Sequence, residues 1–410
     1  MRVILRVTDS GPISLRAGRE TTGAETINYI PGRAVLGGLA EAHASIRRNT
    51  SQFNDFFFAD ESTFGNLYPA SFDPDDLQGV TDPVLPLPAT AIACKRFGGF
   101  TFDEDDPIVA PHHGVYDDLI SWTLFALGGK TRSGVLADLG HCRHHSGCRE
   151  PMDHFDGFYR RNAWDAMKMG SANISQGLRT RTGVSRQTGT VATGILYSRE
   201  VLGPGMGFWG SATITDSCFD AFRDFVQEAS ATGVLRFGNN RTRSMGRVVL
   251  EVNEASDGDT EETLTERIQR FDLEFRKQAA NAEVSTTHAL YVPLTLVSDV
   301  ILVDHLLRYQ TQIDPGYLQQ VWQLQGAEPV YQHNSVRRVM GWQSLLRMPR
   351  ADEVAVAMGS VFLFGFSTPL DKQKVTALLR MQDQGVGVRR REGFGRVVVA
   401  SPFHWEVKGQ

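Results

Sequence analysis

Long hydrophobic runs are absent from this sequence of 410 residues. A membrane-spanning helix needs about 20 consecutive apolar residues, and no stretch of the chain approaches that length. The first residues alternate and then turn polar at Asp9 and Ser10, which is typical of a strand and not of a signal peptide. These absences favour a cytoplasmic protein that has no contact with a membrane.

Lysine and cysteine are also scarce. The chain has 7 Lys against 35 Arg, and its formal net charge is −5. A negative net charge is not typical of a uniformly basic nucleic-acid binder. A cationic surface on this protein would therefore require basic residues to cluster in particular places. A GC-rich genome would explain the ratio of Arg to Lys, but it does not explain why Arg clusters on glycine-rich turns. In a cytoplasmic chain of this length, four cysteines indicate thiols or metal ligands and not a disulfide framework.

Two stretches of the sequence resemble each other, at residues 238–250 and 385–399. Each is a turn rich in glycine and arginine that continues through Gly-Arg-Val-Val into a β-branched strand. Glycine permits positive φ and lets another backbone approach closely, whereas arginine presents forked, permanently charged donors that match phosphate oxygens. The repeat therefore predicts two related modules, each with a turn suited to a nucleic-acid backbone.

The length is sufficient for two domains. Residues 2–8 alternate with a period of two and predict a strand, and Pro31 and Gly32 open a predicted helix. This order is typical of the first half of a ferredoxin-like β-α-β unit, and it restarts at residues 290–297. We therefore predict an α+β protein with two ferredoxin-like domains in tandem. The predicted segments are residues 1–250, with an insertion at about 85–160, an acidic and then helical connector at 251–285, and a second domain at 286–410.

The predicted insertion contains six of the eleven histidines and three of the four cysteines. Cys142, His145 and Cys148 recur every third residue, a spacing that lets a tight turn present ligands to one tetrahedral Zn²⁺. Cys94 is the expected remote ligand, with His113 as a competitor. We predict a structural zinc site; the alternative is a polar loop with unligated histidines and a buried Cys94. No helical His-Glu motif indicates a catalytic zinc.

Further short motifs follow one another along the whole chain. They lie at residues 29–32, 64–69, 86–91, 113–117, 157–159, 186–192, 341–342 and 359–362. In this order they resemble the RAMP superfamily of CRISPR-associated proteins, and within it the Csx-ten family, the Cas-five-like subunit of type III-D effector complexes. One departure is visible, because relatives have a Cys-x-x-Cys pair where this chain has His145 and Cys148.

The resemblance implies that both domains are ferredoxin-like RAMP domains. It also implies a subunit that caps one end of an antiviral ribonucleoprotein and holds the repeat-derived 5′ tag of the guide RNA (crRNA). The implied partners are the guide RNA, complementary target RNA, a large Cas-ten-type subunit and Cas-seven-type backbone subunits.

On this hypothesis, the guide RNA lies across the turns of both modules. The expected RNA-binding residues are Gly238, Asn239, Asn240, Arg241, Arg243 and Arg247 in the first turn, Arg389, Arg390, Arg391, Phe394 and Arg396 in the second, Arg179, Arg181 and Arg186 in a predicted hairpin or loop, and Arg33 at the predicted helix start. Arginines would contact phosphates, which fixes position without reading sequence. Phe237 and Phe394 would stack on splayed bases. Pro31 and Gly32 offer either an anion site at the helix start or merely a compact turn.

Two enzymes of the same superfamily are the alternatives to a pure binder. A guide-processing endoribonuclease would need a general base, and His43 and His288 are its candidates. A backbone subunit that cleaves target RNA would need a loop aspartate. Its candidates are Asp60, Asp103, Asp105, Asp106, Asp117 and Asp118, all of which solvated acidic loops also explain. We expect no catalytic residue.

Overall fold

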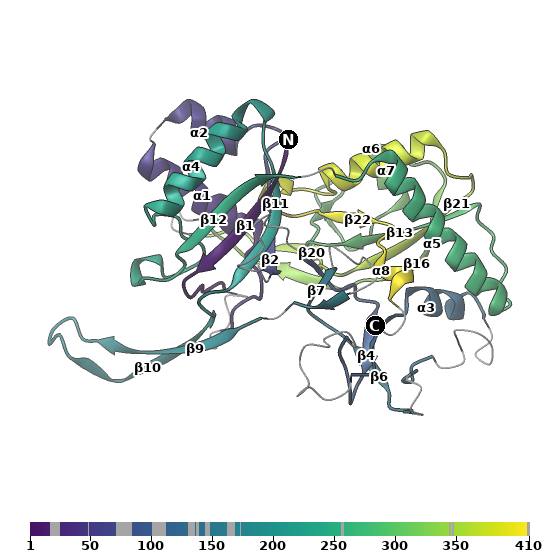
Figure 1. Cartoon of the computed structure of the whole chain (residues 1–410), viewed down its shortest axis with the longest axis horizontal. Coiled ribbons are helices and arrows are strands. Elements are labelled where there is room, and N and C mark those ends of the chain that lie inside the picture. The colour runs from purple at the N-terminus through teal and green to yellow at the C-terminus, as the bar shows by residue number, and fades with distance from the viewer. Residues whose placement is uncertain are drawn as a thin grey trace. The chain divides into compact units, whose positions relative to one another are not determined.

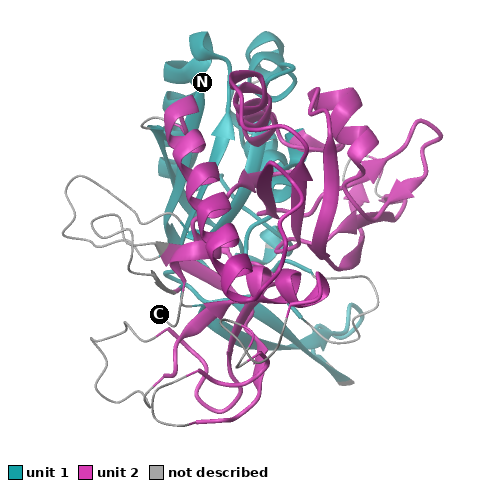
Figure 2. Cartoon of the chain, turned by 90° about the vertical axis from the view of Figure 1, so that its right-hand side faces the viewer, with its two compact units in different colours: residues 1–84, 172–256, 391–393 teal, residues 85–171, 257–390, 394–410 magenta. Residues whose placement is uncertain are grey.

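The computed structural model describes residues 1–16, 25–47, 49–70, 84–100, 112–129, 136, 139–143, 148–161, 169–172, 174–255, 258–343, 346 and 348–407. The chain is a mixture of α-helices and small antiparallel sheets, divided into two compact units (Figure 2). Unit 1 comprises Met1–Val84, Ala172–Ser256 and Arg391–Gly393, and unit 2 comprises Leu85–Ser171, Asp257–Arg390 and Phe394–Gln410. Within the described ranges, no helix is both long and apolar enough to cross a bilayer.

Unit 1 is built on a four-stranded antiparallel sheet (Figure 1). In chain order its elements are β1 (Arg2–Ser10), α1 (Gly32–Ile46), α2 (Thr50–Phe57), β2 (Thr63–Ala70), β11 (Gly207–Thr213), α4 (Phe219–Ala231) and β12 (Val248–Glu254). The strands lie in the order β12-β1-β11-β2, so the fourth strand of the unit lies beside the first. Every neighbouring pair is antiparallel.

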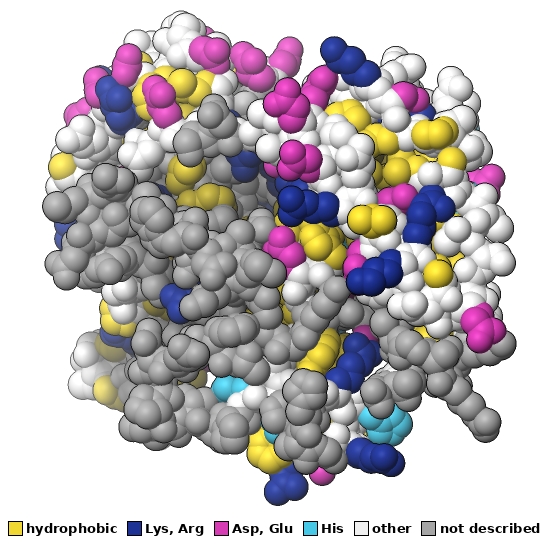
Figure 3. All heavy atoms as spheres, turned by 45° about the vertical axis from the view of Figure 1, so that its right-hand side comes forward, with side chains coloured by type: hydrophobic (Ala, Val, Ile, Leu, Met, Phe, Trp, Pro, Cys, Tyr) yellow, Lys and Arg dark blue, Asp and Glu magenta, His cyan; other side chains and the backbone are white. Residues whose placement is uncertain are grey.

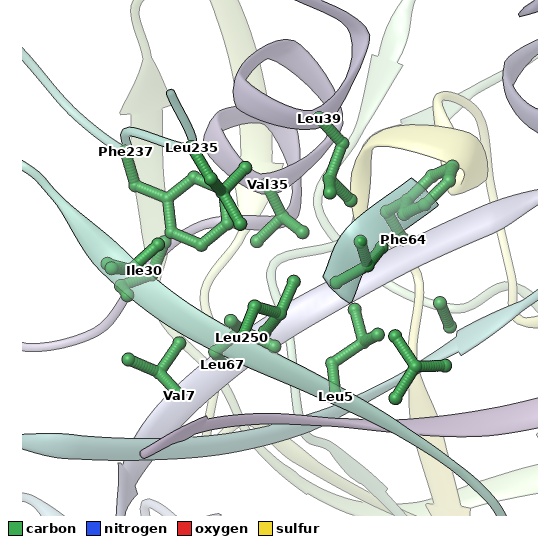
Figure 4. Packing of buried hydrophobic residues seen from close by; sticks show 14 of the residues in the cluster. Leu5, Val7, Ile30, Val35, Leu39, Phe64, Leu67, Leu235, Phe237 and Leu250 are labelled. Carbon is green, nitrogen blue, oxygen red and sulfur yellow. The ribbon is translucent and has the colours of Figure 1, made fainter. Parts of the chain in front are cut away.

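The core of unit 1 follows directly from the sequence pattern. Val3, Leu5 and Val7 alternate along β1 and are fully buried, as the period of two predicts. Phe222 and Phe225 are three positions apart on α4 and pack into the same core. In Figure 4, side chains of the sheet such as Leu5 and Leu67 lie toward Val35 and Leu39 of α1. The helices therefore cover one face of the sheet.

A long hairpin also belongs to unit 1, formed by β9 (Gln176–Val184) and β10 (Val191–Leu202). It precedes β11 in the chain and extends away from the sheet of its unit (Figure 1). The turn is closed by a hydrogen bond from the N–H of Ser185 to the carbonyl of Thr190, and Gly189 supplies a positive φ of 68°. The hairpin that the Arg-rich segment predicted is therefore present.

Unit 2 repeats the sheet of unit 1. In chain order the elements are β13 (Leu290–Leu296), α6 (Pro315–Trp322), β16 (Ala327–His333), β21 (Val361–Phe366), α7 (Lys372–Gln384) and β22 (Val397–Val399). The strands lie in the order β16-β21-β13-β22, so the first strand again has the third on one side and the fourth on the other. Strand β13 lies where the sequence pattern restarts, at residues 290–297.

The predicted connector at 251–285 is divided between the two units. Its first residues extend β12 to Glu254, and the remainder forms α5 (Glu261–Asn281). Helix α5 starts at the capping box of Thr260, and its apolar side chains Leu264 and Ile268 lie in the core of unit 2. Most of the predicted connector is therefore a packed helix, because its apolar positions recur at helical spacing.

The remaining elements belong to unit 2. They are β3 (Val84–Pro86), β4 (Ala91–Cys94), β5 (Val115–Asp117), α3 (Leu119–Ala126), β6 (Met152–His154), β7 (Phe158–Arg161), β8 (Met169–Ser171), β14 (Leu302–Val303), β15 (Tyr309–Gln310), β17 (Val336–Val339), β18 (Trp342–Gln343), β19 (Met348–Pro349), β20 (Glu353–Val356) and α8 (Phe403–Glu406). Residues 85–171 interrupt the first module in sequence, as predicted, but their contacts group them with unit 2. One reason is that Ala89 donates its N–H to the carbonyl of Gly359.

Candidate nucleic-acid interface and metal centre

The two glycine-arginine turns have the same backbone conformation. Gly238 and Gly246 of the first turn have φ values of 85° and 80°, and Gly387 and Gly395, each 149 positions later, have 75° and 85°. Between them, a left-handed residue precedes a short 3₁₀ turn, Arg241–Arg243 in the first case and Arg390–Glu392 in the second. The repeat read from the sequence is therefore a structural repeat, with Gly238 matching Gly387 and not Gly385.

The same backbone hydrogen bonds hold both turns. The N–H of Gly246 donates to Pro12 at 2.9 Å, and the N–H of Gly395 donates to Asp299 at 2.9 Å. In each case the acceptor lies just beyond the first strand of its own sheet, β1 or β13. A side chain at Gly246 would collide with the carbonyl of Phe237 in the same turn. Glycine is needed here because two backbones touch.

Most arginines of the first turn point to solvent. Arg243 and Arg247 are exposed, whereas Arg241 forms an ion pair with Glu41. Arg243 donates to the hydroxyl of Tyr197 on β10 at 2.7 Å, which joins the turn to the hairpin. The predicted residues Gly238, Asn239 and Asn240 form the entry of this turn, and the N–H of Asn239 donates to the carbonyl of Ser14.

Arginines of the second turn form more contacts with other residues of the protein than those of the first turn. Arg389 pairs with Glu353, and its guanidinium lies 4.8 Å from the centre of the Phe394 ring. Arg391 donates to the carbonyls of Phe58 and Ala59 at 3.2 and 3.1 Å, all three residues belonging to unit 1. The further two arginines of this turn are Arg390, which is exposed, and Arg396, which is half-buried.

The structure contradicts the expected stacking role of two phenylalanines. Phe237 is fully buried, and Figure 4 shows its ring in the core beside Ile30 and Leu235. Phe394 is only 7% exposed and packs with Ile301 and other apolar residues of unit 2. Neither ring faces a groove from which a base could approach. Both were misread because aromatic residues next to glycine turns fill the space that the glycines leave.

One face of the β9–β10 hairpin carries a concentration of arginine. Arg179 lies directly opposite Arg199, and Arg181 lies directly opposite Tyr197, so these side chains share a face. Arg181 also donates to the backbone carbonyl of Arg243 at 3.4 Å. Arg186, the third predicted arginine of this segment, is exposed at the hairpin turn.

We define the arginine cluster as Arg16, Arg181, Arg199 and Arg243. Burial lowers the pKa of the Arg199 guanidinium most, and the charges of Arg16, Arg243 and Arg181 lower it further, opposed by Tyr197. The Nη1 atom of Arg199 is buried without a hydrogen-bond partner. No carboxylate among the described residues forms an ion pair with the cluster. An anion placed among these cations would offset their charge and accept the hydrogen bond that Nη1 of Arg199 does not form within the described residues.

On the face of the molecule shown in Figure 3, Lys and Arg side chains are interspersed with Asp and Glu. The net charge of −5 is therefore compatible with a cationic site. The sequence reasoning missed Arg16 and Arg199. A turn at residues 185–190 alone would place Leu196 opposite Arg179; the register shift between Val191 and Leu196 places Arg199 there instead, which no sequence pattern indicated.

The start of α1 does not resemble an anion site. Its first N–H group, that of Gly32, donates to the side chain of Asn66 at 2.9 Å. The N–H groups of Ala34 and Val35 donate to the carbonyl of Pro31. The compact-turn alternative therefore fits this position. Arg33 lies in the first turn of α1 and is half-buried, so its contact with RNA stays a prediction.

The predicted zinc ligands come together in unit 2. Cys94, His113, Cys142 and Cys148 each offer one ligand atom, and these four atoms lie within 4.8 Å of one another. The Sγ atoms of Cys94 and Cys148 are 4.0 Å apart, and Nδ1 of His113 is 3.3 Å from Sγ of Cys142. Tetrahedral Zn²⁺ with Zn–S bonds of about 2.3 Å places sulfur atoms about 3.8 Å apart. The donor set and its dimensions therefore fit zinc.

Strand pairing brings these ligands together. Cys94 ends β4, and β4 pairs with β5, which follows His113, and with β6, which follows Cys148. Cys94, His113 and Cys142 are at most 6% exposed. Among the described residues, the histidine that joins the three cysteines is His113, the competitor in the sequence analysis. His145 lies outside the described residues.

The protonation of Cys94 also fits metal binding. Burial opposes ionisation of its thiol, but the N–H groups of Arg96 and Phe97 and the neighbouring thiols of Cys142 and Cys148 hold the pKa of Cys94 below its usual value. A thiolate is the form that binds a metal. Because three cysteines and one histidine fill a tetrahedron, no position remains for a reacting water. The site suits a structural metal.

A buried polar network lies beside the metal site. Arg143, which follows Cys142, donates to Asp118 at 2.7 Å, and the side chain of Asp118 is 2% exposed. The neighbouring Asp117 contacts Nδ1 of His404 at 3.0 Å, and Nε2 of His404 lies 2.6 Å from the hydroxyl of Thr295. This chain of contacts reaches β13 of the main sheet of unit 2.

The candidate catalytic residues are mostly buried. His43 is fully buried, and its ring contacts Phe56 and Phe225. Asp117 and Asp118 belong to the network described above, whereas Asp60 is exposed. His288 lies 4.0 Å from Glu328, and its side chain is 17% exposed. Three of the candidate aspartates, Asp103, Asp105 and Asp106, lie outside the described residues.

Comparisons with known proteins gave structural likenesses only. No family model and no curated protein matches the chain. A chain of the type III-B Cmr-beta complex bound to cognate target RNA is 14% identical, with a TM-score of 0.40, and the match covers 88% of this chain and 86% of that one. A chain of the Csm3–Csm4 subcomplex of a type III-A interference complex is 10% identical, with a TM-score of 0.33, over 91% and 96%. A Cas6 product complex is 10% identical, with a TM-score of 0.35, over 97% and 98%. These TM-scores lie below 0.5, so the likeness assigns neither family nor function.

Proposed function

We propose that this protein binds single-stranded RNA as a subunit of a CRISPR ribonucleoprotein, and that its two sheets are tandem ferredoxin-like RAMP domains. The observation that carries the RNA-binding proposal is the arginine cluster. Nη1 of Arg199 is buried and has no partner within the described parts of the chain, and burial together with the neighbouring cations lowers the pKa of this guanidinium. A phosphate would remove the repulsion and accept the unused hydrogen bond.

The arrangement around the cluster favours an extended strand of RNA over a small anion. Arg179 shares the face of Arg181 on the hairpin, Arg186 is exposed at the hairpin turn, and Arg243 and Arg247 are exposed in the first turn. A single phosphate would need only two or three of these donors. A row of guanidinium groups instead matches successive phosphates, which positions a nucleic acid without reading its sequence.

The motifs quoted above support a finer proposal. They resemble the Csx-ten family, so the bound strand would be the guide RNA of a type III-D effector complex, held by its 5′ tag. Complementary target RNA, a large Cas-ten-type subunit and Cas-seven-type backbone subunits would be the neighbours. We propose a binding role without catalysis; the ring of His43, one of the candidate general bases, is buried.

The metal centre has a structural role in this proposal. Cys94, His113, Cys142 and Cys148 would hold one zinc ion, which would cross-link the segments around β4, β5 and β6. Such a link would add to the stability that the buried apolar residues of β4 and β5 provide. The nearby Arg143 would then be fixed in position to neutralise Asp118.

Binding of a short unstructured RNA tests the function directly. The affinity of the purified protein should fall linearly with the logarithm of the salt concentration, because bound phosphates release counterions. Incubation of the protein with repeat RNA and with guide-bound target RNA tests for catalysis. Absence of binding at low salt would refute the proposal, and cleavage abolished by one His or Asp substitution would favour the endoribonuclease alternative.

A further inference from the structure

Unit 2 has an arm in the same place along its chain as the hairpin of unit 1. The arm spans residues 336–356, between β16 and β21, as the hairpin lies between β2 and β11. Strands β17 and β20 form its base, and β18 and β19 form its outer part. A hydrogen bond from the N–H of Arg350 to Gly341 joins the two parts. Each repeat therefore inserts an antiparallel arm between its second and third strands.

The base of the arm is fixed to the second glycine-arginine turn. Val339 and Ala355 pack with Phe394 of that turn in one buried cluster. Glu353 of β20 forms an ion pair with Arg389, the left-handed residue of the turn. In unit 1 the corresponding contact is the hydrogen bond from Arg243 of the first turn to the hydroxyl of Tyr197 on the β9–β10 hairpin. In both units, therefore, the turn and the arm form one surface.

The outer part of the arm is apolar yet exposed. The side chain of Trp342 is 62% exposed, and Leu346 and Met348 are 61% and 51% exposed. The sequence from 334 to 351 contains four arginines and no acidic residue. Two of them, Arg337 and Arg338, remain 42% and 61% exposed although each contacts an aspartate. A protruding indole beside cations is the composition of a surface that stacks on bases.

We propose that Trp342 stacks on a base of single-stranded RNA, the backbone of which runs along the arm and the second turn. This inference rests on the proposed function and adds the base-stacking residue that Phe394 does not provide. The indole would contribute contact area and the arginines would contribute attraction for phosphate, so the occupant is RNA and not an apolar protein surface. Stacking is tolerant of sequence because every base has a π-face.

Substitution of Trp342 tests the inference, with Trp122 as the matched control. Trp122 is also in unit 2 and 39% exposed, but it lies on α3 against Phe125, at a ring distance of 5.7 Å, and away from the arm in sequence. Fluorescence anisotropy with a short unstructured RNA would be measured for W342A, W342F and W122A over a range of salt. W342A should weaken binding by about 5- to 150-fold, the range for loss of one stacked base.

The variants should also differ in ways that a merely structural effect would not produce. W342A should leave the dependence of log affinity on log salt unchanged, because no phosphate contact is lost, and W342F should retain most of the affinity. RNA should quench tryptophan fluorescence in W122F and quench it less in W342F. Equal affinity and quenching for the Trp342 variants and the wild type would overturn the inference and indicate a protein-docking arm. Failure of the wild type to bind RNA would instead refute the proposed function.

Discussion

The arginine cluster allows a prediction in which binding and stability change in opposite directions. In the double variant R181Q/R199Q, two of the four mutually repelling cations are removed. Each phosphate contact on a single strand contributes about 0.7 to the slope of log affinity against log salt, so the slope should become shallower by about 1.4. Between 50 and 200 mM salt, the affinity of the variant should then fall about sevenfold less than that of the wild type.

The stability of the same variant should not decrease. Arg199 lies directly opposite Arg179, and like charges opposite each other on a hairpin destabilise it by a few tenths of a kcal/mol up to about 1 kcal/mol. Removal of Arg199 relieves this repulsion, so the free energy of unfolding should stay equal or rise by up to about 1 kcal/mol. Urea denaturation of the protein without RNA measures this free energy of unfolding.

A matched control separates the cluster from the net charge. The variant R47Q/R223Q removes the same total charge from unit 1, but from arginines paired with Glu228 and Asp220 at 2.8 and 2.7 Å. Its salt slope should equal that of the wild type, and its stability should fall by up to about 1 kcal/mol per pair. If both double variants flatten the slope equally, or if R181Q/R199Q leaves it unchanged, the anion site is not where we place it.

Three further predictions concern the turns, the metal and the buried ion pair. Gly246→Ala should destabilise the protein by more than about 1 kcal/mol in urea denaturation, because φ is 80° and the new Cβ meets the Phe237 carbonyl, whereas Gly37→Ala, at an open position of α1, should not destabilise it. Purified protein should contain one zinc per chain by elemental analysis; Cys142→Ser should lose the zinc and lower the melting temperature, and Cys218→Ser should keep it. Arg143→Gln should cost about 3 kcal/mol in urea denaturation because Asp118 is left buried and unpaired, and adding Asp118→Asn should restore part of the loss. An additive double variant would show that the pair is not coupled.

The sequence was most informative at positions where the backbone conformation requires glycine. Positive φ and close backbone contact demand glycine, so the repeated turns at residues 238–247 and 387–396 are visible as glycine spacing. The strands β1 and β13 were also visible, β1 from its alternation of buried and less buried residues and β13 from a largely apolar run that is buried throughout. Three of the four residues at the candidate metal site were identified in the sequence because they are cysteines.

Features that depend on tertiary placement were not predictable in the same way. His113 joins the ligand set because β4 pairs with β5, a pairing between residues more than twenty positions apart. Arg199 joins the arginine cluster because of the hairpin register, and Phe394 is buried because the arm folds over it. The grouping of residues 85–171 with unit 2 likewise depends on contacts with residues such as Gly359, which are remote in sequence.

Ultraviolet cross-linking of the full-length protein to a short single-stranded RNA, followed by mass spectrometry of the cross-linked peptides, tests the central claim most directly. The account predicts cross-links within the hairpin at 176–202, where Tyr197 lies among the arginines, and within the first turn at 238–247. The cross-links should disappear when salt disrupts binding. Efficient cross-links confined to other segments of the chain would contradict the account.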